Sequence, residues 1–277
     1  MKIKVLGSAA AEGIPALWCE CKMCRAARKN GGRDIRRRTS YLIDDDTIVD
    51  FGPDAFFQCV DFNIDLQRVK RVLFTHSHAD HMNAPDLVYR KRGFSSVSGK
   101  IRVFGNEVVM KKIPVLTGLS FGELMIEPRI VRALEKITDG DMAIYPLEAN
   151  HCGESAGEQA LNYIIERKSK RVLIANDTGW WPAKSWARAR RFKLDAAFIE
   201  STCALRPTHI DCREGHLGAN AAVAFRDRLV ETGALSVRTP VFVNHFSHNG
   251  LALHGDLCGF FKPHGIRVAY DGLMVSL

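Results

Sequence analysis

The sequence predicts a single domain of the mixed α/β class, and three observations support this prediction. A chain of 277 residues with 46% hydrophobic content is long enough to bury a large core. Short apolar runs typical of strands are interleaved with segments of helical periodicity. No internal repeat or low-complexity linker divides residues 1–277 into separate domains.

The predicted strands share one feature, which is that many are followed by a residue of a type that binds metals. We expect strands at Lys2 to Leu6, Thr39 to Ile43, Thr47 to Asp50, Lys70 to Phe74, Ile101 to Phe104, Met142 to Glu148, Tyr163 to Glu166, Arg171 to Ala175, Ala196 to Ile199 and Pro240 to Val243. Helical periodicity is clearest from Ala219 to Leu229, with a second candidate from Ala183 to Arg191. The strand-end residues are expected to meet at one sheet edge in a single cleft.

The chain shows no sign of export or membrane insertion. No stretch approaches the roughly 20 apolar residues that span a bilayer, and the segment from Met1 to Gly7 is short and charged for a signal peptide. We therefore expect a cytoplasmic protein with no membrane partner. In that compartment five cysteines are expected to be reduced thiols: Cys59, Cys152, Cys203, Cys212 and Cys258.

The formal net charge of +8 suggests an anionic partner. The basic clusters could either form solvent-exposed faces of the protein or attract phosphate groups. They are not accompanied by the interspersed aromatic residues that are typical of RNA-binding segments. The clustered residues are Arg25, Arg28, Lys29, Arg33, Arg36, Arg37 and Arg38, and further along Arg188, Arg190, Arg191 and Lys193.

The segment from Thr75 to His81 is the strongest functional signal, because it places four potential ligands directly after an apolar strand. Imidazole and carboxylate suit a borderline divalent cation, and so many ligands in one short loop indicate two adjacent metals. A polar turn with hydrogen-bonded histidines is the alternative. Several adjacent buried imidazoles, however, would repel one another when charged, so a metal or an anion is needed between them.

The order of motifs resembles the metallo-β-lactamase fold hydrolases: Asp50 after a strand, His-x-His-x-Asp-His at residues 76–81, a lone His151, Asp177 after a strand, and a late His245. The resemblance implies an αββα sandwich with two divalent metals, for which zinc, manganese and iron are all compatible. It assigns His76, His78 and His151 to one metal and Asp80, His81 and His245 to the other. Asp177 would bridge both metals, and Asp50 would orient the loop.

The start of the chain narrows the resemblance to the PhnP-type phosphodiesterases and, more distantly, to PqqB-type proteins of quinone-cofactor synthesis. The matching segments are Gly7 to Ala10, Ile14-Pro15, Cys19 to Cys24, His245 to His248 and Ala269 to Gly272. PqqB-like chains lack the intact histidine loop. The intact loop here therefore favours hydrolysis.

Cys19, Cys21 and Cys24 form a separate candidate metal site, a zinc-binding loop at residues 18–25. Soft thiolates select zinc, and a structural zinc takes four ligands. The resemblance supplies His248 as the fourth ligand. Ordinary reduced thiols or a redox pair are the alternative.

The expected function is hydrolysis of a small or cyclic phosphodiester by a hydroxide that two metals activate. Asp80, as a metal ligand, and His216, as leaving-group acid or phosphate contact, are the candidate catalytic residues; His216 could instead cap or pack. We expect His209, His254 and His264 to be structural or surface residues.

Two other functions remain open. A ribonuclease Z-like RNA processor would share much of the metal set, but Met82 to Glu148 contains no Gly/Pro-rich arm of the kind that grips RNA. A non-hydrolytic PqqB-like cofactor-synthesis protein is the other alternative, since fold does not fix function. The expected partner is a small phosphodiester, with nucleic acid as the weaker alternative. Members of the family often dimerise, and the sequence leaves a homodimer open.

Overall fold

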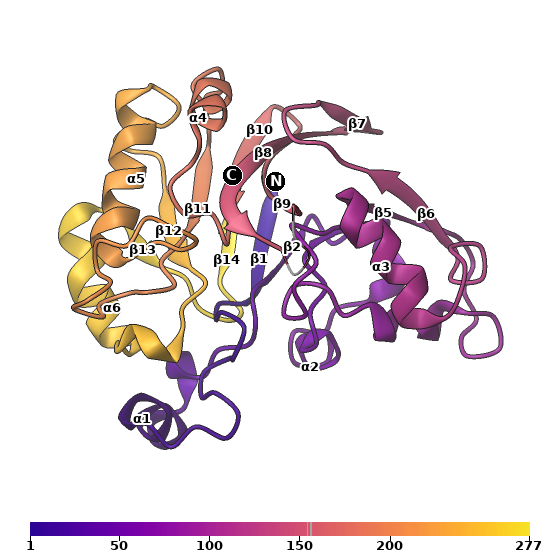
Figure 1. The fold of residues 1–277 in the computed structure, drawn as a ribbon, viewed down its shortest axis with the longest axis horizontal. Coiled ribbons are helices and arrows are strands. Elements are labelled where there is room, and N and C mark those ends of the chain that lie inside the picture. The colour runs from indigo at the N-terminus through magenta and orange to yellow at the C-terminus, as the bar shows by residue number, and fades with distance from the viewer. Residues whose placement is uncertain (154, 156) are drawn as a thin grey trace.

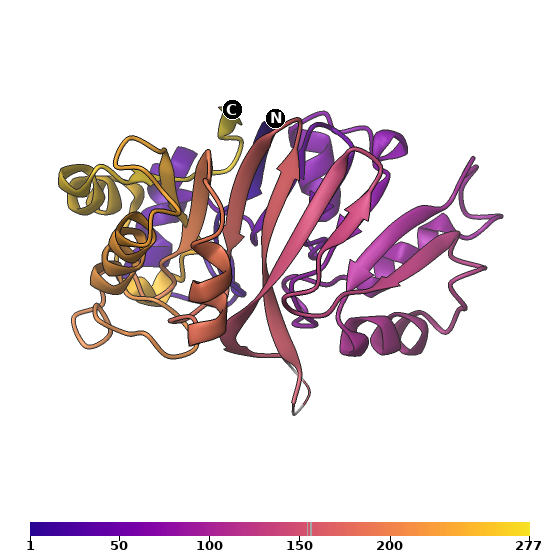
Figure 2. The same ribbon diagram turned by 90° about the horizontal axis from the view of Figure 1, so that it is seen from above.

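Two seven-stranded sheets pack face to face in the computed structural model, which describes residues 1–153, 155 and 157–277. Helices cover the outer faces of both sheets (Figures 1 and 2), so the chain forms the predicted αββα sandwich. Helices α4 (Ala183–Ala189), α5 (Ala219–Glu231) and α6 (His254–Phe261) lie against one sheet and α3 (Glu107–Thr117) against the other. The metallo-β-lactamase fold class predicted from the resemblance is confirmed.

The first sheet has the strand order β14-β1-β2-β3-β4-β5-β6. Its pairs are antiparallel from β14 to β3 and parallel from β3 to β6. The strands are β1 (Lys2–Gly7), β2 (Ser40–Ile43), β3 (Thr47–Val49), β4 (Arg71–Leu73), β5 (Ile101–Gly105), β6 (Ile126–Ile130) and β14 (Met274–Ser276).

The second sheet has the order β13-β12-β11-β10-β9-β8-β7 and is parallel from β10 to β13. Parallel strands end at the same sheet edge, so the loops after β10, β11 and β12 lie together. The strands are β7 (Ile137–Asp139), β8 (Met142–Cys152), β9 (Gln159–Arg167), β10 (Lys170–Ala175), β11 (Ala196–Glu200), β12 (Val241–Asn244) and β13 (Arg267–Val268).

Six α-helices and five short 3₁₀ segments connect the strands in the described part of the chain. The α-helices are α1 (Lys22–Asn30), α2 (Ala55–Asp61), α3 (Glu107–Thr117), α4 (Ala183–Ala189), α5 (Ala219–Glu231) and α6 (His254–Phe261). The 3₁₀ segments are η1 (Gly32–Asp34), η2 (Leu66–Arg68), η3 (Ala84–Arg90), η4 (His248–Gly250) and η5 (Lys262–His264). None of the helices in the described part of the chain is long and apolar enough to cross a membrane.

Apolar side chains form three layers, one between the sheets and one beneath each helical cover. In the central layer Tyr41 packs edge-on against Phe198 with ring centroids 5.1 Å apart. Tyr163 donates its buried hydroxyl to the carbonyl of Phe74 at 2.7 Å, which ties the two sheets together next to the histidine loop. Because both faces of each sheet are buried, the central strands have continuous apolar sequences without polar alternation.

All ten predicted strands and both predicted helices are present, with ends shifted by up to four residues. The predictions missed four strands and four helices. Edge strand β6 contains Pro128 between two charged residues, which hides its strand character. The expectation of a loop at residues 18–25 was partly wrong, because α1 begins at Lys22 and includes Cys24. His151 was expected after a strand, but β8 runs on to Cys152.

Candidate active site and thiolate cluster

The loop after β4 carries the predicted histidines, and Asp50 holds it in place. Asp50 is fully buried at the end of β3 and accepts the Thr75 amide at 2.8 Å and the Thr75 hydroxyl at 3.0 Å. Its other oxygen lies 2.7 Å from Nδ1 of His81. A carboxylate accepts hydrogen bonds, so Nδ1 of His81 donates and Nε2 is free to bind a metal.

Glu158, which directly precedes β9, holds the same loop from the other side, and no sequence pattern predicted it. Its carboxylate accepts the Ser77 amide at 2.9 Å, the Ser77 hydroxyl at 2.5 Å and the side-chain amide of Asn106 at 2.8 Å. Glu158 is buried, and these donors satisfy it. The histidine loop is thus fixed at both flanks by buried carboxylates.

His76, His78 and His151 form the first cluster, as the resemblance implied. Nδ1 of His78 lies 2.8 Å from Nε2 of His76 and 3.3 Å from Nε2 of His151. Nδ1 of His151 donates to the carbonyl of Gly215 at 3.0 Å, which leaves Nε2 without a proton. A tetrahedral zinc would separate two nitrogen ligands by about 3.3 Å, so these nitrogens fit around one ion.

Asp80, His81, Asp177 and His245 form the second cluster. Oδ2 of Asp177 lies 2.6 Å from Nε2 of His81 and 3.4 Å from Nε2 of His245. The same oxygen lies 3.7 Å from Nε2 of His76 in the first cluster. Asp177 therefore faces both clusters, which is the position that the bridging assignment requires.

Three residues of the site have left-handed backbone conformations that non-glycine residues seldom adopt. Asp50, Asp177 and His245 have φ angles of 62°, 43° and 60°, and each follows the end of a strand. Such conformations cost about 1–3 kcal/mol each and persist where the surroundings impose them. The fold holds these side chains toward the centre at a cost in stability.

The polar atoms and charges of the second cluster fit a cation. Nε2 of His245 is buried without a hydrogen-bond partner among the described residues, and Nε2 of His81 makes no well-oriented hydrogen bond there although Oδ2 of Asp177 lies 2.6 Å away. Burial lowers the pKa of His81, but the carboxylates of Asp80, Asp50 and Asp177 outweigh burial and hold this pKa well above its usual value. The centre of the cluster therefore stabilises positive charge, which a divalent metal would supply in place of the proton.

The histidines of the first cluster are suited to bind as neutral ligands. Burial lowers the pKa of His76 and of His78, and the neighbouring imidazoles lower both further. Neutral imidazole is the form that binds metals. The residues present therefore fit two divalent ions.

His216 lies in the loop before α5 and contacts the second cluster. Its Nδ1 is 3.2 Å from Oδ1 of Asp177 and 3.1 Å from Oε2 of Glu200. It precedes Gly218, the N-cap of α5, and is therefore not part of that helix. Burial lowers the pKa of His216, but Glu200 and Asp177 outweigh burial and raise it to about 12. The assignment of His216 as leaving-group acid or phosphate contact remains a prediction.

Glu200 is a site residue that the sequence did not single out. It is fully buried at the end of β11 and accepts the Thr178 amide at 2.6 Å and the Gly179 amide at 3.0 Å. Thr202 donates its hydroxyl to Glu200 and lies 2.9 Å from Nδ1 of His245. Glu200 thereby positions the Asp177 loop, His216 and, through Thr202, His245. A glutamate at a strand end was the available signal.

A cavity of about 330 Å³ opens above both clusters. The loop at residues 10–12 forms one wall, the segment 202–206 another and the 245–249 loop a third. Arg206 is exposed at this wall and makes no ion pair or side-chain hydrogen bond with other described residues. It is a further residue that the sequence did not single out.

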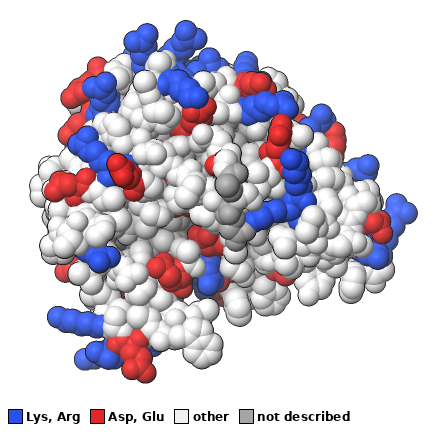
Figure 3. Space-filling model, in the orientation of Figure 1, with Lys and Arg blue, Asp and Glu red and all other residues white. Residues whose placement is uncertain are grey.

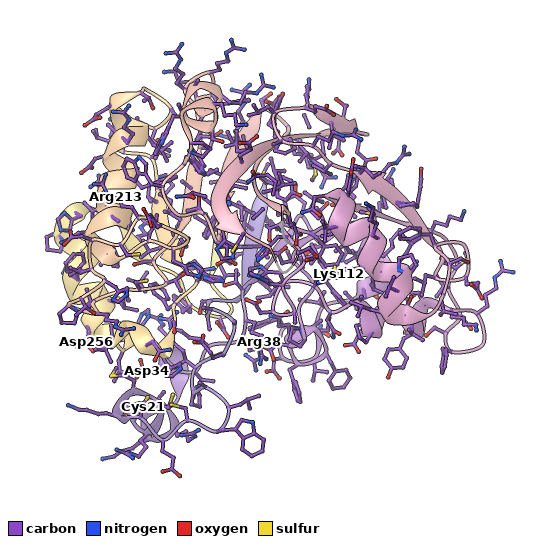
Figure 4. All side chains as sticks on the ribbon, in the orientation of Figure 1. Cys21, Asp34, Arg38, Lys112, Arg213 and Asp256 are labelled. Carbon is purple, nitrogen blue, oxygen red and sulfur yellow. The ribbon has the colours of Figure 1, made fainter. Side chains whose placement is uncertain are left out.

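Cys19, Cys21, Cys24 and His248 form the thiolate cluster. Cys19 and Cys21 precede α1 (Figure 4, Cys21), Cys24 lies in α1 and His248 lies in η4. Nδ1 of His248 lies 3.6 Å from the sulfur of Cys19 and 3.5 Å from that of Cys21. A tetrahedral zinc would place nitrogen and sulfur ligands about 3.5 Å apart. The backbone amides of Ala16, Cys21 and Cys24 point at the sulfurs, as they do toward thiolates. The four residues fit a zinc ion.

The remaining cysteines and histidines lie outside these three clusters, as the sequence analysis expected. Cys59, Cys152, Cys203, Cys212 and Cys258 are free thiols. His254 contacts the buried Arg36, and His209 contacts Thr208.

Comparison with known proteins agrees with this geometry. Residues 46–237, well over half of the chain, match the beta-lactamase superfamily domain. The chain belongs to the beta-lactamase superfamily. This match confirms the family resemblance drawn from the motifs. Most proteins of this superfamily are hydrolases.

Two curated relatives match the chain. Coenzyme PQQ synthesis protein B of Methylobacterium radiotolerans is 26% identical over the full length of both proteins. An octanoyltransferase of Porphyromonas gingivalis is 36% identical over 90 residues. That match spans 31% of this chain and 17% of the octanoyltransferase, so it concerns a small part of that protein.

Three solved structures share the fold over nearly their whole length. A diphosphatase of the PhnP family superposes with a TM-score of 0.76 at 21% identity, covering 99% of this chain and 96% of its own. Zinc-bound PqqB of Methylobacterium extorquens follows with 0.75 and 18%, covering 100% of both chains. The short form of human tRNase Z has 0.68 and 17%, covering 100% of this chain and 99% of its own. At these identities the similarity establishes the fold alone.

Proposed function

We propose that this protein is a metal-dependent phosphodiesterase that hydrolyses a small phosphodiester, linear or cyclic. The supporting observation is the cavity of about 330 Å³, which has both candidate metal clusters at its base and Arg206 and His216 in its wall. Two divalent ions, when bound, supply an activated water and positive charge for the phosphoryl oxygens.

The chain's own residues would bind and orient the substrate. The Arg206 guanidinium presents donors to a phosphate oxygen at the cavity wall. His216 is held by Glu200 through Nδ1 and lies among the cavity residues. It can therefore donate a proton to the leaving oxygen or contact a phosphate oxygen.

The size of the cavity and the placement of the basic residues favour a small substrate over RNA. The cavity volume lies near the lower end of the roughly 300–1,000 Å³ usual for small-molecule sites. Arg36 is buried, and Arg37 and Arg38 pair with Asp61 and Asp54 (Figure 4, Arg38). On the face in Figure 3 lysines and arginines are interspersed with acidic side chains.

A second candidate function is a step in cofactor synthesis like that of coenzyme PQQ synthesis protein B. The full-length match to that protein, at 26% identity, is the observation in its favour. The complete set of ligand-type residues in both clusters favours hydrolysis instead. Metal ions with an open coordination position serve chemistry.

The experiment that tests the proposal is turnover by purified protein loaded with zinc or with manganese. The substrates are bis-p-nitrophenyl phosphate, a 2′,3′-cyclic nucleotide, a lactone and a pre-tRNA. We expect hydrolysis of the first two. Rapid hydrolysis of the lactone with every phosphodiester untouched would refute the substrate class, and cleavage confined to the pre-tRNA would favour a ribonuclease Z-like function. No turnover of any substrate would favour the cofactor-synthesis candidate.

A further inference from the structure

Glu12 lies between the active-site cavity and the thiolate cluster. It lines the cavity wall, and its Oε1 accepts the Ser247 hydroxyl at 3.1 Å and the side-chain amide of Asn249 at 3.3 Å. The same oxygen lies 3.8 Å from Nε2 of His248. One carboxylate therefore faces three consecutive residues of the 245–249 loop, which carries His245 of the second cluster and His248 of the thiolate cluster.

The two nitrogens of His248 have different partners. Nδ1 faces the sulfurs of Cys19 and Cys21 at 3.6 and 3.5 Å. A metal held by those sulfurs takes the lone pair of Nδ1, so the proton of the neutral ring must lie on Nε2. Nε2 is the atom that faces Glu12. A carboxylate opposite the N–H of a metal-bound histidine fixes its tautomer and ring orientation and increases its basicity.

We propose that Glu12 is a positioning residue for His248, the histidine that completes the thiolate cluster. Its carboxylate holds the imidazole in the tautomer that presents Nδ1 to the metal, and it fixes the 245–249 loop at the wall of the active-site cavity. This role rests on the proposed structural zinc. Because Glu12 also lines the cavity, the same side chain links the zinc to the shape of the substrate site.

Backbone hydrogen bonds hold the 245–249 loop in addition to Glu12. The backbone of Phe246 pairs with the N-terminal segment, since Phe246 donates its amide to Ser8 at 3.0 Å and accepts the amide of Ala10 at 2.9 Å. Glu12 is only partly buried, with 37% of its side chain exposed. Substitution of Glu12 should therefore preserve the fold, and a change in metal binding would report on His248.

The variants Glu12→Ala and Glu12→Gln test the proposal in the full chain with cobalt or zinc in the thiolate cluster. Glu12→Gln keeps an oxygen for Ser247 and Asn249 but removes the charge opposite His248. The control is Glu20→Gln, which removes an exposed charge between Cys19 and Cys21. Glu20 has no ion pair or side-chain hydrogen bond within the described ranges, so its loss should change nothing.

The measurements are metal release to a chelator and the sulfur-to-cobalt absorption, which is specific to the thiolate cluster. Substitution of a residue that hydrogen-bonds to a metal ligand reduces metal affinity roughly 10–100-fold. Since Glu12 is partly exposed, we expect release about 10-fold faster in Glu12→Ala, a smaller change in Glu12→Gln, and a shifted absorption in both. Release and absorption identical to wild type in Glu12→Ala would overturn the proposal.

Wild-type protein that binds no cobalt through sulfur would overturn both this role and the structural zinc. Neither measurement uses turnover. A protein without phosphodiesterase activity that still shows the Glu12 effect would refute the proposed function and support the proposed role of Glu12.

Discussion

The carboxylate of Asp50 lies 2.7 Å from Nδ1 of His81, and both side chains are fully buried. The same carboxylate accepts the amide and the hydroxyl of Thr75, so it joins the end of β3 to the histidine loop. His81 therefore has its Nε2 directed at the second cluster before any metal arrives. Asp50 is expected to raise metal affinity without touching the metal.

Replacement of Asp50 by alanine should lower metal affinity about 10–100-fold. It should also cost about 1–3 kcal/mol of stability, because the buried Thr75 amide loses its acceptor. Metal per chain after dialysis against graded chelator, together with urea unfolding, measures both effects. Asp61→Asn serves as control, since Asp61 is 43% exposed and pairs with Arg37 at the surface. Wild-type metal retention in Asp50→Ala would contradict the orienting role.

The predicted ligands could be found from sequence because each is a chemically distinctive residue close to a strand end. Asp50, Asp177 and His245 directly follow or nearly follow apolar strands, and the fold brings those ends together. The grouping of ligands into two clusters came from the family resemblance, since residues such as His78 and His151, 73 positions apart, carry no local signal of contact.

The buried supports of the site could not be predicted in this way. Glu158 acts on Ser77 across 81 positions of sequence, and Glu200 acts on Thr178 across 22. A single glutamate is in most cases a surface residue, so only its three-dimensional neighbours reveal its role. Edge strand β6 was missed for a similar reason, because its polar and proline residues suit an edge and resemble a loop.

Substitution Asp80→Ala should reduce phosphodiester turnover to the background rate and leave the fold intact. Asp80 lies 3.0 Å from Nε2 of His81 in the second cluster, and its removal takes away one ligand. Turnover, metal per chain and far-UV circular dichroism check this expectation. Retained turnover with a native spectrum would refute the two-metal mechanism.

Substitution His216→Ala distinguishes a proton donor from a phosphate contact. If His216 protonates the leaving oxygen, the rate for a substrate with a poor alkoxide leaving group should fall about 100–10,000-fold in the variant. The rate for a substrate with a p-nitrophenolate leaving group should change little, because that group leaves without protonation. A phosphate contact would instead raise KM for both substrates alike. Paired measurements of kcat and KM decide between the two roles. Wild-type kinetics with both substrates would leave His216 with neither role.

Substitution Cys21→Ser should remove about one zinc per chain and lower the melting temperature. Cys21 contacts His248 and also caps α1, because its sulfur accepts the Cys24 amide at 3.4 Å. Loss of the metal would free His248 and loosen the loop that carries His245, so activity should fall although no cysteine contacts substrate. Cys59→Ser is the control, a half-buried thiol outside the clusters. Unchanged zinc content and stability would reduce the cluster to ordinary thiols.

His254 should make the stability of the fold depend on pH between about 4 and 6.5. Arginine nitrogens only donate hydrogen bonds, and Nη2 of Arg36 lies 2.9 Å from Nδ1 of His254. Nδ1 must therefore accept, which it can do only when the imidazole is neutral. Burial, followed by the charges of Arg36 and Arg33, lowers the pKa of His254 to about 4.

The direction in which stability changes with pH follows from the number of protons bound by the folded and unfolded chains. Between about pH 4 and the usual histidine pKa of about 6.5 the unfolded chain binds more protons at this residue than the folded chain. The contribution of His254 is therefore complete above pH 6.5 and is lost as the pH falls to 4. The ring is partly exposed, so screening reduces the effect to about 1–2 kcal/mol.

The variant His254→Asn keeps an acceptor for Arg36 and removes the titrating ring. The difference in unfolding free energy between wild type and variant, measured by urea unfolding, should be constant above pH 7. Between pH 7 and pH 4 it should shift by about 1–2 kcal/mol against the wild type. Acid loss of metal affects both proteins alike, because His254 lies outside the metal clusters, so it cancels in the difference. A difference that stays constant down to pH 4 would show that His254 keeps its ordinary pKa.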